Sequence, residues 1–260
     1  MYFGCCINDS SKIKEVKAAG YDFYEFSGTA LSGMDEGTFF DLVNETVKNG
    51  IPCIGFNAYC PGRPSMAGEA FSEREIEDYA DRICARGKAL SVANIGIGAP
   101  KARILPDGYD YSTAVEQLGR FLSITSQIAR YYSINVLMES VHSGLCNLVT
   151  RTSEAFKIVD ELKADNLFMV LDFYHMEMMG ETLDSIDVAT PYLKHTHIST
   201  KGENLFRGFP QADESEKYKE IISRLKNRGY NLTMSVEPSM FDFSLAAGTL
   251  EMLKSIDEKV

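Results

Sequence analysis

The sequence predicts a single α/β domain, a (β/α)8 or TIM barrel, that spans residues 1–260. Short apolar runs of strand type recur at a mean spacing of about 33 residues, the size of one strand–helix unit, and a helical pattern or turn follows each. Eight such units fit a chain of 260 residues, because this barrel takes about 250. An open doubly wound sheet is the alternative, but no G-x-G-x-x-G follows the first strand. No linker or low-complexity tract divides the chain.

The expected strands and helices alternate along the whole chain. Strands are expected at residues 2–7, 21–27, 51–56 and 91–97, and in four runs that end at Glu139, Asp172, His197 and Glu237. Helices are expected at residues 10–19, 39–49, 72–89, 113–131, 153–162, 182–188, 215–227 and 245–256. Gly20 is a suitable end for the first helix, and Ser72 with Glu75 forms a capping box. Loops at 59–71 and 98–108 follow strands and are long enough to be functional.

Composition and charge narrow the class of partner. The net charge of −11 disfavours nucleic acid, because such a surface repels phosphate backbones. No run approaches the roughly 18 apolar residues of a membrane span, and the first residues lack the pattern of a signal peptide. The six cysteines form no C-x-x-C pair and are expected to be reduced. We therefore expect a cytoplasmic protein with a small-molecule partner and neither nucleic acid nor membrane; a homo-oligomer is compatible with the sequence.

Four expected strands end in residues that bind metals. Val136–Glu139 and Val170–Asp172 end in a carboxylate, Leu193–His197 ends in an imidazole, and Thr233–Glu237 ends in a carboxylate before Pro238. The carboxyl ends of the strands of a barrel lie on one face, where catalytic groups are found. Three carboxylates and one imidazole favour Mn²⁺, with Mg²⁺, Co²⁺ or Zn²⁺ as alternatives. The expected metal ligands are therefore Glu139, Asp172, His197 and Glu237.

Other polar residues on the same side are candidates for substrate binding. His175 lies three residues after Asp172, over the expected barrel mouth, and His142 lies three after Glu139. Arg103 and Arg207 lie in loops that follow strands and could bind a hydroxyl or phosphate group. For each of the four, an ordinary solvated loop residue is the alternative.

Two further titratable residues lie within expected strands. His195 shares the parity of His197, so it should point inward one layer deeper, as a packing or supporting residue. Glu25, near the end of the second strand, could face the mouth or be a surface carboxylate.

Taken in order along the chain, these motifs resemble a known family. The order Glu139, Asp172-x-x-His175, His195-x-His197, Glu237-Pro238 is similar to that of the xylose-isomerase-like sugar phosphate isomerase/epimerase superfamily. The likeness covers essentially the whole chain, and residues 98–108 resemble that superfamily's loop after strand four.

The resemblance implies roles for individual residues. In the ketose 3-epimerase branch, the glutamates that match Glu139 and Glu237 both bind the metal and exchange protons with the substrate carbon. The residues that match Asp172 and His197 are ligands only. The residues that match His175 and Arg207 bind substrate.

Two departures limit what the resemblance implies. Those epimerases carry a substrate-binding glutamate six residues after the strand-five ligand, where this chain has Leu145. The superfamily also holds endonucleases that act at abasic DNA sites, which need extra histidines at strands three and four. Residues 55–57 and 96–98 offer none, and the net charge of −11 opposes DNA, so we set that function aside.

The predicted function is a divalent-metal-dependent sugar isomerase or epimerase that moves a proton through an enediolate of a ketose or sugar phosphate. Glu139 and Glu237 are the predicted catalytic residues. A dehydratase of a keto-inositol or polyol and a non-catalytic sugar-binding barrel are the alternatives. The sequence does not distinguish the sugar or whether it is phosphorylated.

Overall fold

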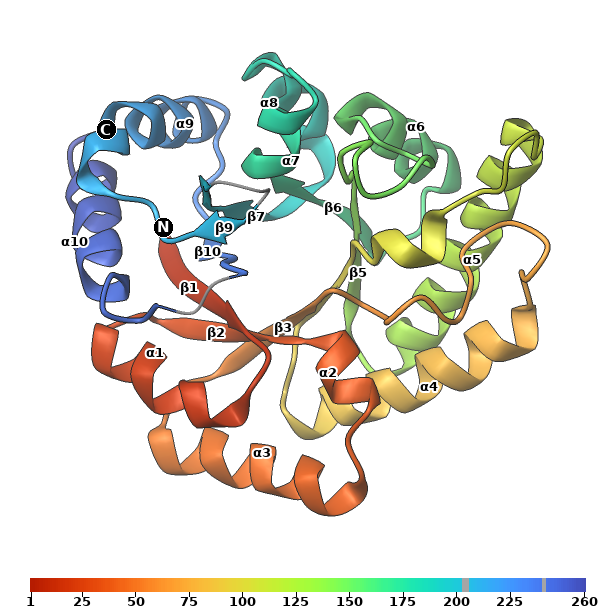
Figure 1. Cartoon of the computed structure of the whole chain (residues 1–260), viewed down its shortest axis with the longest axis horizontal. Coiled ribbons are helices and arrows are strands. Elements are labelled where there is room, and N and C mark those ends of the chain that lie inside the picture. Colours follow the sequence, from red (N-terminus) through yellow and green to blue (C-terminus); the bar gives the residue numbers. More distant parts are fainter. Residues whose placement is uncertain (203–205, 240–241) are drawn as a thin grey trace.

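The computed structural model describes residues 1–202, 206–239 and 242–260, and in this part of the chain eight parallel strands close into a barrel (Figure 1). Around the ring they follow the order β1-β10-β7-β6-β5-β4-β3-β2. Their bounds are β1 Tyr2–Ile7, β2 Phe23–Ser27, β3 Cys53–Asn57, β4 Asn94–Ile97, β5 Asn135–Glu139, β6 Leu167–Asp172, β7 Leu193–Ile198 and β10 Thr233–Val236. The predicted (β/α)8 fold is confirmed.

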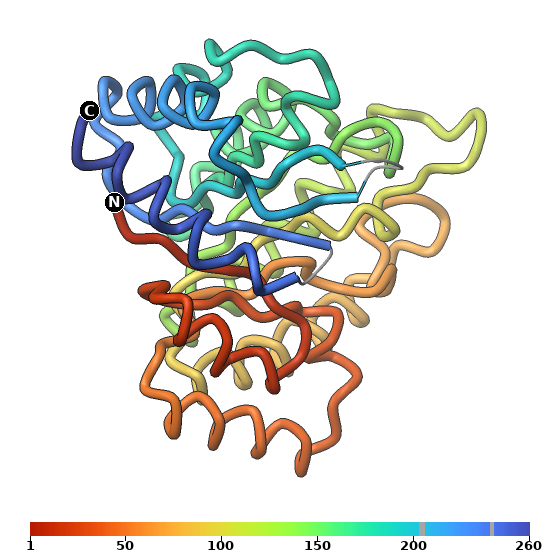
Figure 2. Tube along the Cα trace, turned by 60° about the vertical axis from the view of Figure 1, so that its left-hand side comes forward, coloured from red at the N-terminus to blue at the C-terminus, as the bar shows by residue number. Residues whose placement is uncertain are grey.

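Helices form a ring outside the barrel, which Figure 1 shows end-on. Their bounds are α1 Ile13–Ala19, α2 Gly28–Ser32, α3 Glu36–Asn49, α4 Glu73–Ala89, α5 Tyr111–Tyr131, α6 Thr152–Leu162, α7 Phe173–Met178, α8 Asp184–Ala189, α9 Ser215–Asn227 and α10 Ala246–Asp257. The two chain ends meet, since the amino group of Met1 lies 2.7 Å from Asp257 Oδ2 (Figures 1 and 2). Among the described residues, no helix has the length and apolar character needed to cross a membrane.

Local signals account for where the helices begin and end. Ser72 caps α4, because its hydroxyl accepts a hydrogen bond from the main-chain N–H of Glu75 at 3.4 Å. Gly20 and Gly50 follow α1 and α3 with φ angles of 92° and 59°, a left-handed conformation that glycine adopts without strain. The boundaries predicted at these glycines are therefore confirmed.

The structure adds short elements that the sequence pattern did not predict. These are α2, α7, and a hairpin of β8 Thr200–Lys201 with β9 Arg207–Gly208. The hairpin turns the chain after β7 back, so that Arg207 returns to the barrel mouth. The α7 helix begins directly at the end of β6, because Asp172 Oδ1 accepts hydrogen bonds from the N–H groups of Tyr174 and His175. Asp172 thus caps the helix that carries His175.

Packed side chains close the barrel interior beneath the strand ends. Phe23 fills the space beside Gly4, where a Cβ atom would lie only 2.0 Å from the Phe23 ring. The same ring meets the His195 ring edge-on, with 6.2 Å between centroids. Figure 2 shows the loops after β3 and β4 and the β8–β9 hairpin projecting from one end of the barrel. Any site in the barrel must therefore open at that end.

Candidate metal centre and active site

Four side chains at the carboxyl ends of the barrel strands come together. Glu139 ends β5, Asp172 ends β6, His197 lies near the end of β7, and Glu237 directly follows β10. Each can supply one ligand atom, and these atoms lie within 4.8 Å of one another. Glu139, Asp172 and His197 are buried, whereas Glu237 is partly exposed. The structure thus brings together all four residues that the sequence identified as candidate ligands.

Strand register and one glycine explain this convergence. Asp172 pairs with His197, and His197 pairs with Ser235, so these three residues on neighbouring strands lie at the same level along the barrel. Glu237 lies two residues after Ser235, on the same side of the chain. Room for Glu139 comes from Gly98, because a Cβ atom there would lie 2.3 Å from Glu139 Oε2.

Burial and neighbouring charges shift the pKa values in opposite directions. Burial raises the pKa of Glu139 to about 7, although His197 opposes the shift. Burial also acts to raise the pKa of Asp172, but the charge of Arg207 outweighs it and holds that pKa well below its usual range. For His197, burial acts to lower the pKa, while Glu237 and Glu25 raise it well above its usual value. The centre therefore combines one carboxyl poised near neutrality with groups that stay ionised.

The donor set fits a single divalent cation. Among the described residues, Glu139 Oε1 and His197 Nδ1 are buried without a hydrogen-bond partner. Nδ1 lies 3.6 Å from both Glu139 Oε1 and Glu237 Oε2. Ligands on opposite sides of an ion bound at about 2.1 Å lie about 4.2 Å apart, so the observed spacing needs only small movements. Three oxygens and one nitrogen suit Mn²⁺, Mg²⁺, Co²⁺ or Zn²⁺, and the choice of Mn²⁺ stays a prediction.

Arg207 enters the centre from the β8–β9 hairpin. Its Nη2 lies 2.5 Å from Asp172 Oδ2 and 2.8 Å from Glu237 Oε2, and its Nε donates to Ser199 Oγ at 3.0 Å. The guanidinium also stacks over the Tyr174 ring, 4.8 Å from its centroid. Two carboxylates and an aromatic face thus hold Arg207 where a substrate oxygen could reach it.

His175 and His142 stand side by side at the barrel mouth, with 5.2 Å between ring centroids. Both are buried, and among the described residues neither His175 Nδ1 nor His142 Nε2 has a hydrogen-bond partner. Burial lowers the pKa of His175 to about 3, so its imidazole is neutral. Their position is compatible with the predicted role in substrate binding.

Arg103 lies elsewhere than the sequence led us to expect. Its side chain is wholly buried, and it donates to the carbonyl oxygens of Gly98, Glu139 and Val149 at 2.6, 3.0 and 3.4 Å. A guanidinium committed to three main-chain carbonyls inside the protein does not face a substrate. Arg103 instead ties the loops after β4 and β5 together, which supports Glu139 from behind.

Two residues that were not among the predicted ligands or substrate-binding residues belong to the centre. Glu25 is only 4% exposed and contacts both His195 and His197, so it is not a surface carboxylate. Asn57, at the end of β3, donates a hydrogen bond from Nδ2 to Glu237 Oε1. In the sequence, only the position of each polar residue at the end of an expected strand indicated that it could belong to the site.

The mouth of the barrel is divided into two hollows of about 260 Å³ each. Arg207, Glu237 and Ser239 line both. One hollow adds polar groups from Asn8, Ser27 and Asn57. The other adds Glu139, His142 and His175, together with an apolar wall that includes Val141 and Leu145. A small polar molecule can therefore lie across Glu237 and reach both sides.

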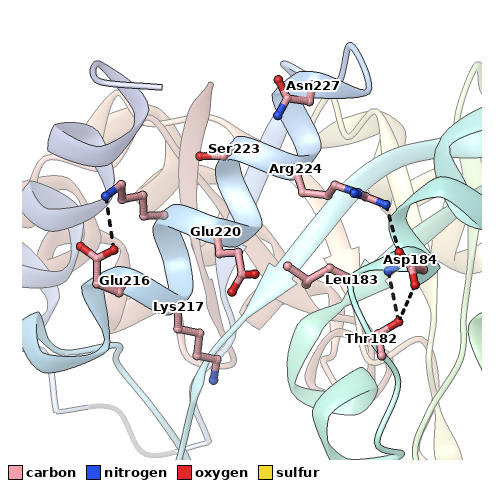
Figure 3. Close-up of a pocket in the computed structure, with 10 residues that line it drawn as sticks. Thr182, Leu183, Asp184, Glu216, Lys217, Glu220, Ser223, Arg224 and Asn227 are labelled. Atoms are coloured by element: carbon pink, nitrogen blue, oxygen red, sulfur yellow. Dashed lines mark hydrogen bonds and ion pairs between the residues drawn. The ribbon is translucent and has the colours of Figure 1, made fainter.

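A larger hollow, of about 760 Å³, lies outside the barrel between the start of α8 and the length of α9 (Figure 3). Several of its charged side chains are paired, as Arg224 is with Asp184 at 3.0 Å and Lys219 with Glu216 at 3.2 Å. Exposed pairs of this kind are solvated and bind little. The barrel mouth, and not this hollow, is therefore the candidate active site.

Comparison with known proteins agrees with this architecture. Residues 13–258 match the model of the family described as xylose isomerase-like TIM barrel. An inosose isomerase of Halalkalibacterium halodurans is 28% identical over 127 residues, which are 45% of this chain and 43% of that protein. The chain thus aligns with less than half the length of this curated relative.

Two of the solved structures with a similar fold are a ketose epimerase and a zinc-bound protein. A D-psicose 3-epimerase from Clostridium cellulolyticum H10, crystallised with D-tagatose, superposes with a TM-score of 0.74 at 17% identity. The match covers 100% of this chain and 96% of the epimerase chain. The IolI protein with a bound zinc atom superposes with a TM-score of 0.74 at 18% identity. The match covers 100% of this chain and 99% of the IolI chain. At these identities the likeness shows the fold alone. The family match over 13–258 shows more: this chain belongs to the xylose isomerase-like TIM barrel family.

Proposed function

We propose that this protein is a metal-dependent isomerase or epimerase of a small polyhydroxy ketone. The observation that carries the proposal is the pair Glu139 and Glu237, whose carboxylate oxygens each lie 3.6 Å from His197 Nδ1 and which both line the open mouth. A divalent ion held by these residues with Asp172 and His197 would polarise the substrate carbonyl and stabilise an enediolate.

The chain's own residues would then move the proton. Glu139, with a pKa raised to about 7, is suited to accept a proton from the carbon next to the carbonyl and release it again. Glu237 lines the same hollow, where Asn57 orients it through a hydrogen bond to Oε1. If Glu139 removes the proton and Glu237 returns one to the other face, the carbon is epimerised; return to the neighbouring carbon gives isomerisation.

Substrate binding would fall to groups around this pair. Arg207 can donate to an oxygen of the substrate while it stays bonded to Asp172. His142 Nε2 and His175 Nδ1, which lack partners among the described residues, can bond to hydroxyl groups. The polar hollow at Asn8, Ser27 and Asn57 offers further donors and acceptors.

The test is reaction in D₂O with metal-loaded protein and a panel of ketohexoses. Exchange at a carboxyl open to water should place deuterium at the carbon next to the carbonyl. Glu139→Gln and Glu237→Gln should each lower kcat by orders of magnitude, since an amide cannot accept the proton. Bound metal is measured in the same samples, with His197→Ala as the variant expected to lose it. A fully active Glu237→Gln enzyme would refute the two-glutamate mechanism.

A keto-inositol is the second candidate substrate. The curated relative is an inosose isomerase, and the IolI protein shares the fold. The chemistry would be the same, with a cyclic ketone in place of an open-chain ketose, so inososes belong in the panel. Release of water during turnover would indicate a dehydratase instead. Tight sugar binding without turnover of any substrate would indicate a non-catalytic barrel.

A further inference from the structure

The carboxylate of Glu25 is buried inside the barrel and takes no part in the proton transfer proposed above. It lies on β2, its Oε1 is 2.7 Å from His195 Nε2 and 3.3 Å from His197 Nε2, and only 4% of the residue is exposed. An isolated buried carboxylate is costly, so the structure must supply compensating donors. The two imidazoles are those donors.

The two ring nitrogens of His197 face different partners. Nε2 faces Glu25, while Nδ1 faces Glu139 and Glu237 at 3.6 Å. Among the residues that the structure describes, Nδ1 is buried without a hydrogen-bond partner. An ionised carboxylate can only accept a hydrogen bond, so the nitrogen that faces Glu25 must carry the hydrogen. When the ring gives up its second hydrogen to bind a metal, the free lone pair therefore lies on Nδ1, which faces the cluster of carboxylates.

We infer that Glu25 is a positioning residue that holds His197 in its Nε2–H tautomer and so makes Nδ1 the nitrogen ligand of the metal. The inference rests on the metal site of the proposed function and adds to it the atom that binds and the residue that selects it. Carboxylates that accept from the second nitrogen of a metal-bound histidine fix its tautomer and orientation, and their loss costs about 10- to 100-fold in metal affinity.

Several contacts keep Glu25 in place for this role. His195 Nδ1 is bonded to the Thr233 hydroxyl at 2.7 Å, which leaves its Nε2–H to donate to Glu25. Cys6 Sγ donates to the same Oε1 at 3.6 Å. On the other side, Gly55 leaves room, because a Cβ atom there would lie 3.0 Å from Glu25 Oε2. Glu25 thus holds one position, with Oε1 directed at both histidines.

A rival interpretation treats Cys6, Glu25 and His197 as ligands of a second ion, since their ligand atoms also lie within 4.8 Å of one another. It would require His197 Nε2 to lose its hydrogen and Cys6 to ionise. Cys6 and Glu25 are buried and already share a hydrogen bond. The geometry therefore favours a hydrogen-bonded support over a second site, and metal stoichiometry separates the two.

The first experiment measures metal affinity by calorimetry with Zn²⁺ and Mn²⁺. In Glu25→Gln the amide can donate to Nε2, which shifts the ring toward the Nδ1–H tautomer, and Kd should rise about 10- to 100-fold. Tyr24→Phe is the matched control, because it removes the hydrogen bond of the neighbouring β2 residue to Thr46 Oγ1 at 2.6 Å and leaves Glu25 and both histidines untouched; its Kd should stay within about threefold of wild type. Circular dichroism shows whether each variant is folded.

The second experiment needs no variant. Long-range ¹H–¹⁵N NMR of the Zn²⁺-loaded protein should show His197 with a protonated Nε2 and a metal-shifted Nδ1. A metal-shifted Nε2, two ions per chain, or wild-type affinity in folded Glu25→Gln would each overturn the inference and leave the proposed isomerase standing. A wild-type protein that binds no metal would overturn both.

Discussion

A single added methyl group at Gly98 should disable the metal centre without unfolding the barrel. A Cβ atom at this position would lie 2.3 Å from Glu139 Oε2. Atoms in contact lie more than 3 Å apart, so the carboxylate oxygen must move by about 1 Å. The obstructed atom is the end of a flexible side chain, and Glu139 will therefore move in preference to the backbone.

The expected loss of metal affinity is large because a metal site tolerates only small displacements of its ligands. Ligand distances vary by only about 0.2 Å, so a displacement of about 1 Å removes Glu139 as a ligand. We expect Gly98→Ala to raise the Kd for Mn²⁺ about 100-fold, which corresponds to about 2.7 kcal/mol. Overpacking costs about 1 to 3 kcal/mol of folding stability, and this site should fall at the lower end. The metal-free protein should then lose only about 2 to 4 °C in Tm.

Gly96 offers the matched control. It lies two residues earlier, and the nearest atom to its Cβ would be the carbonyl oxygen of Phe56 at 3.4 Å, an ordinary contact. Calorimetric titration of wild type, Gly96→Ala and Gly98→Ala with Mn²⁺ compares the three directly. Gly96→Ala should bind as wild type does. If Gly98→Ala also binds within about threefold of wild type, Glu139 is not a ligand or the loop after β4 yields, and the reasoning fails.

Three other predictions concern protons and thiols. Metal affinity should fall as the pH drops from 8 to 6, most steeply below about 7, because protons compete for the carboxyl of Glu139, whose pKa is about 7, and for His197, whose pKa Glu237 and Glu25 raise; titrations at pH 6, 7 and 8 check this. His175→Ala should raise KM or lower kcat at unchanged metal content, and a loss of metal would make His175 a ligand. The six cysteines are buried, and burial raises the pKa of Cys53 to about 12, so a thiol reagent should modify them only after denaturation.

The sequence was sufficient to identify the four residues that converge at the candidate metal site, because a parallel barrel places the carboxyl ends of all its strands at one mouth. A charged residue that ends an apolar run is conspicuous, and four such runs specified Glu139, Asp172, His197 and Glu237. To identify these four residues, it was not necessary to know which distant residues contact one another. The fold class followed in the same way from the repeat of strand and helix.

Interactions across the barrel could not be predicted in this way. Glu25 on β2 meets His197 on β7, and β1 and β10 separate these strands in the ring. Only closure of the barrel brings the two side chains together. Arg103 and Arg207 look alike in sequence, since both lie in loops after strands, but one is locked on main-chain carbonyls and the other enters the mouth. The short helices α2 and α7 begin directly at the ends of β2 and β6, so no loop in the sequence separates them from the strands.

The order of the strands bears directly on the stereochemistry of the proposed reaction. Glu139 ends β5 and Glu237 follows β10, and β6 and β7 lie between those strands in the ring. His197, on β7, has its Nδ1 equally far from both carboxylates. If a substrate carbon is held between the two carboxylates, each glutamate can reach it. Two bases on opposite faces suit inversion at one carbon, whereas transfer between adjacent carbons on one face needs a single base. Deuterium introduced by wild type and by each Glu→Gln variant therefore separates epimerisation from isomerisation: two bases exchange solvent hydrogen in both directions, and a single base can return the same proton.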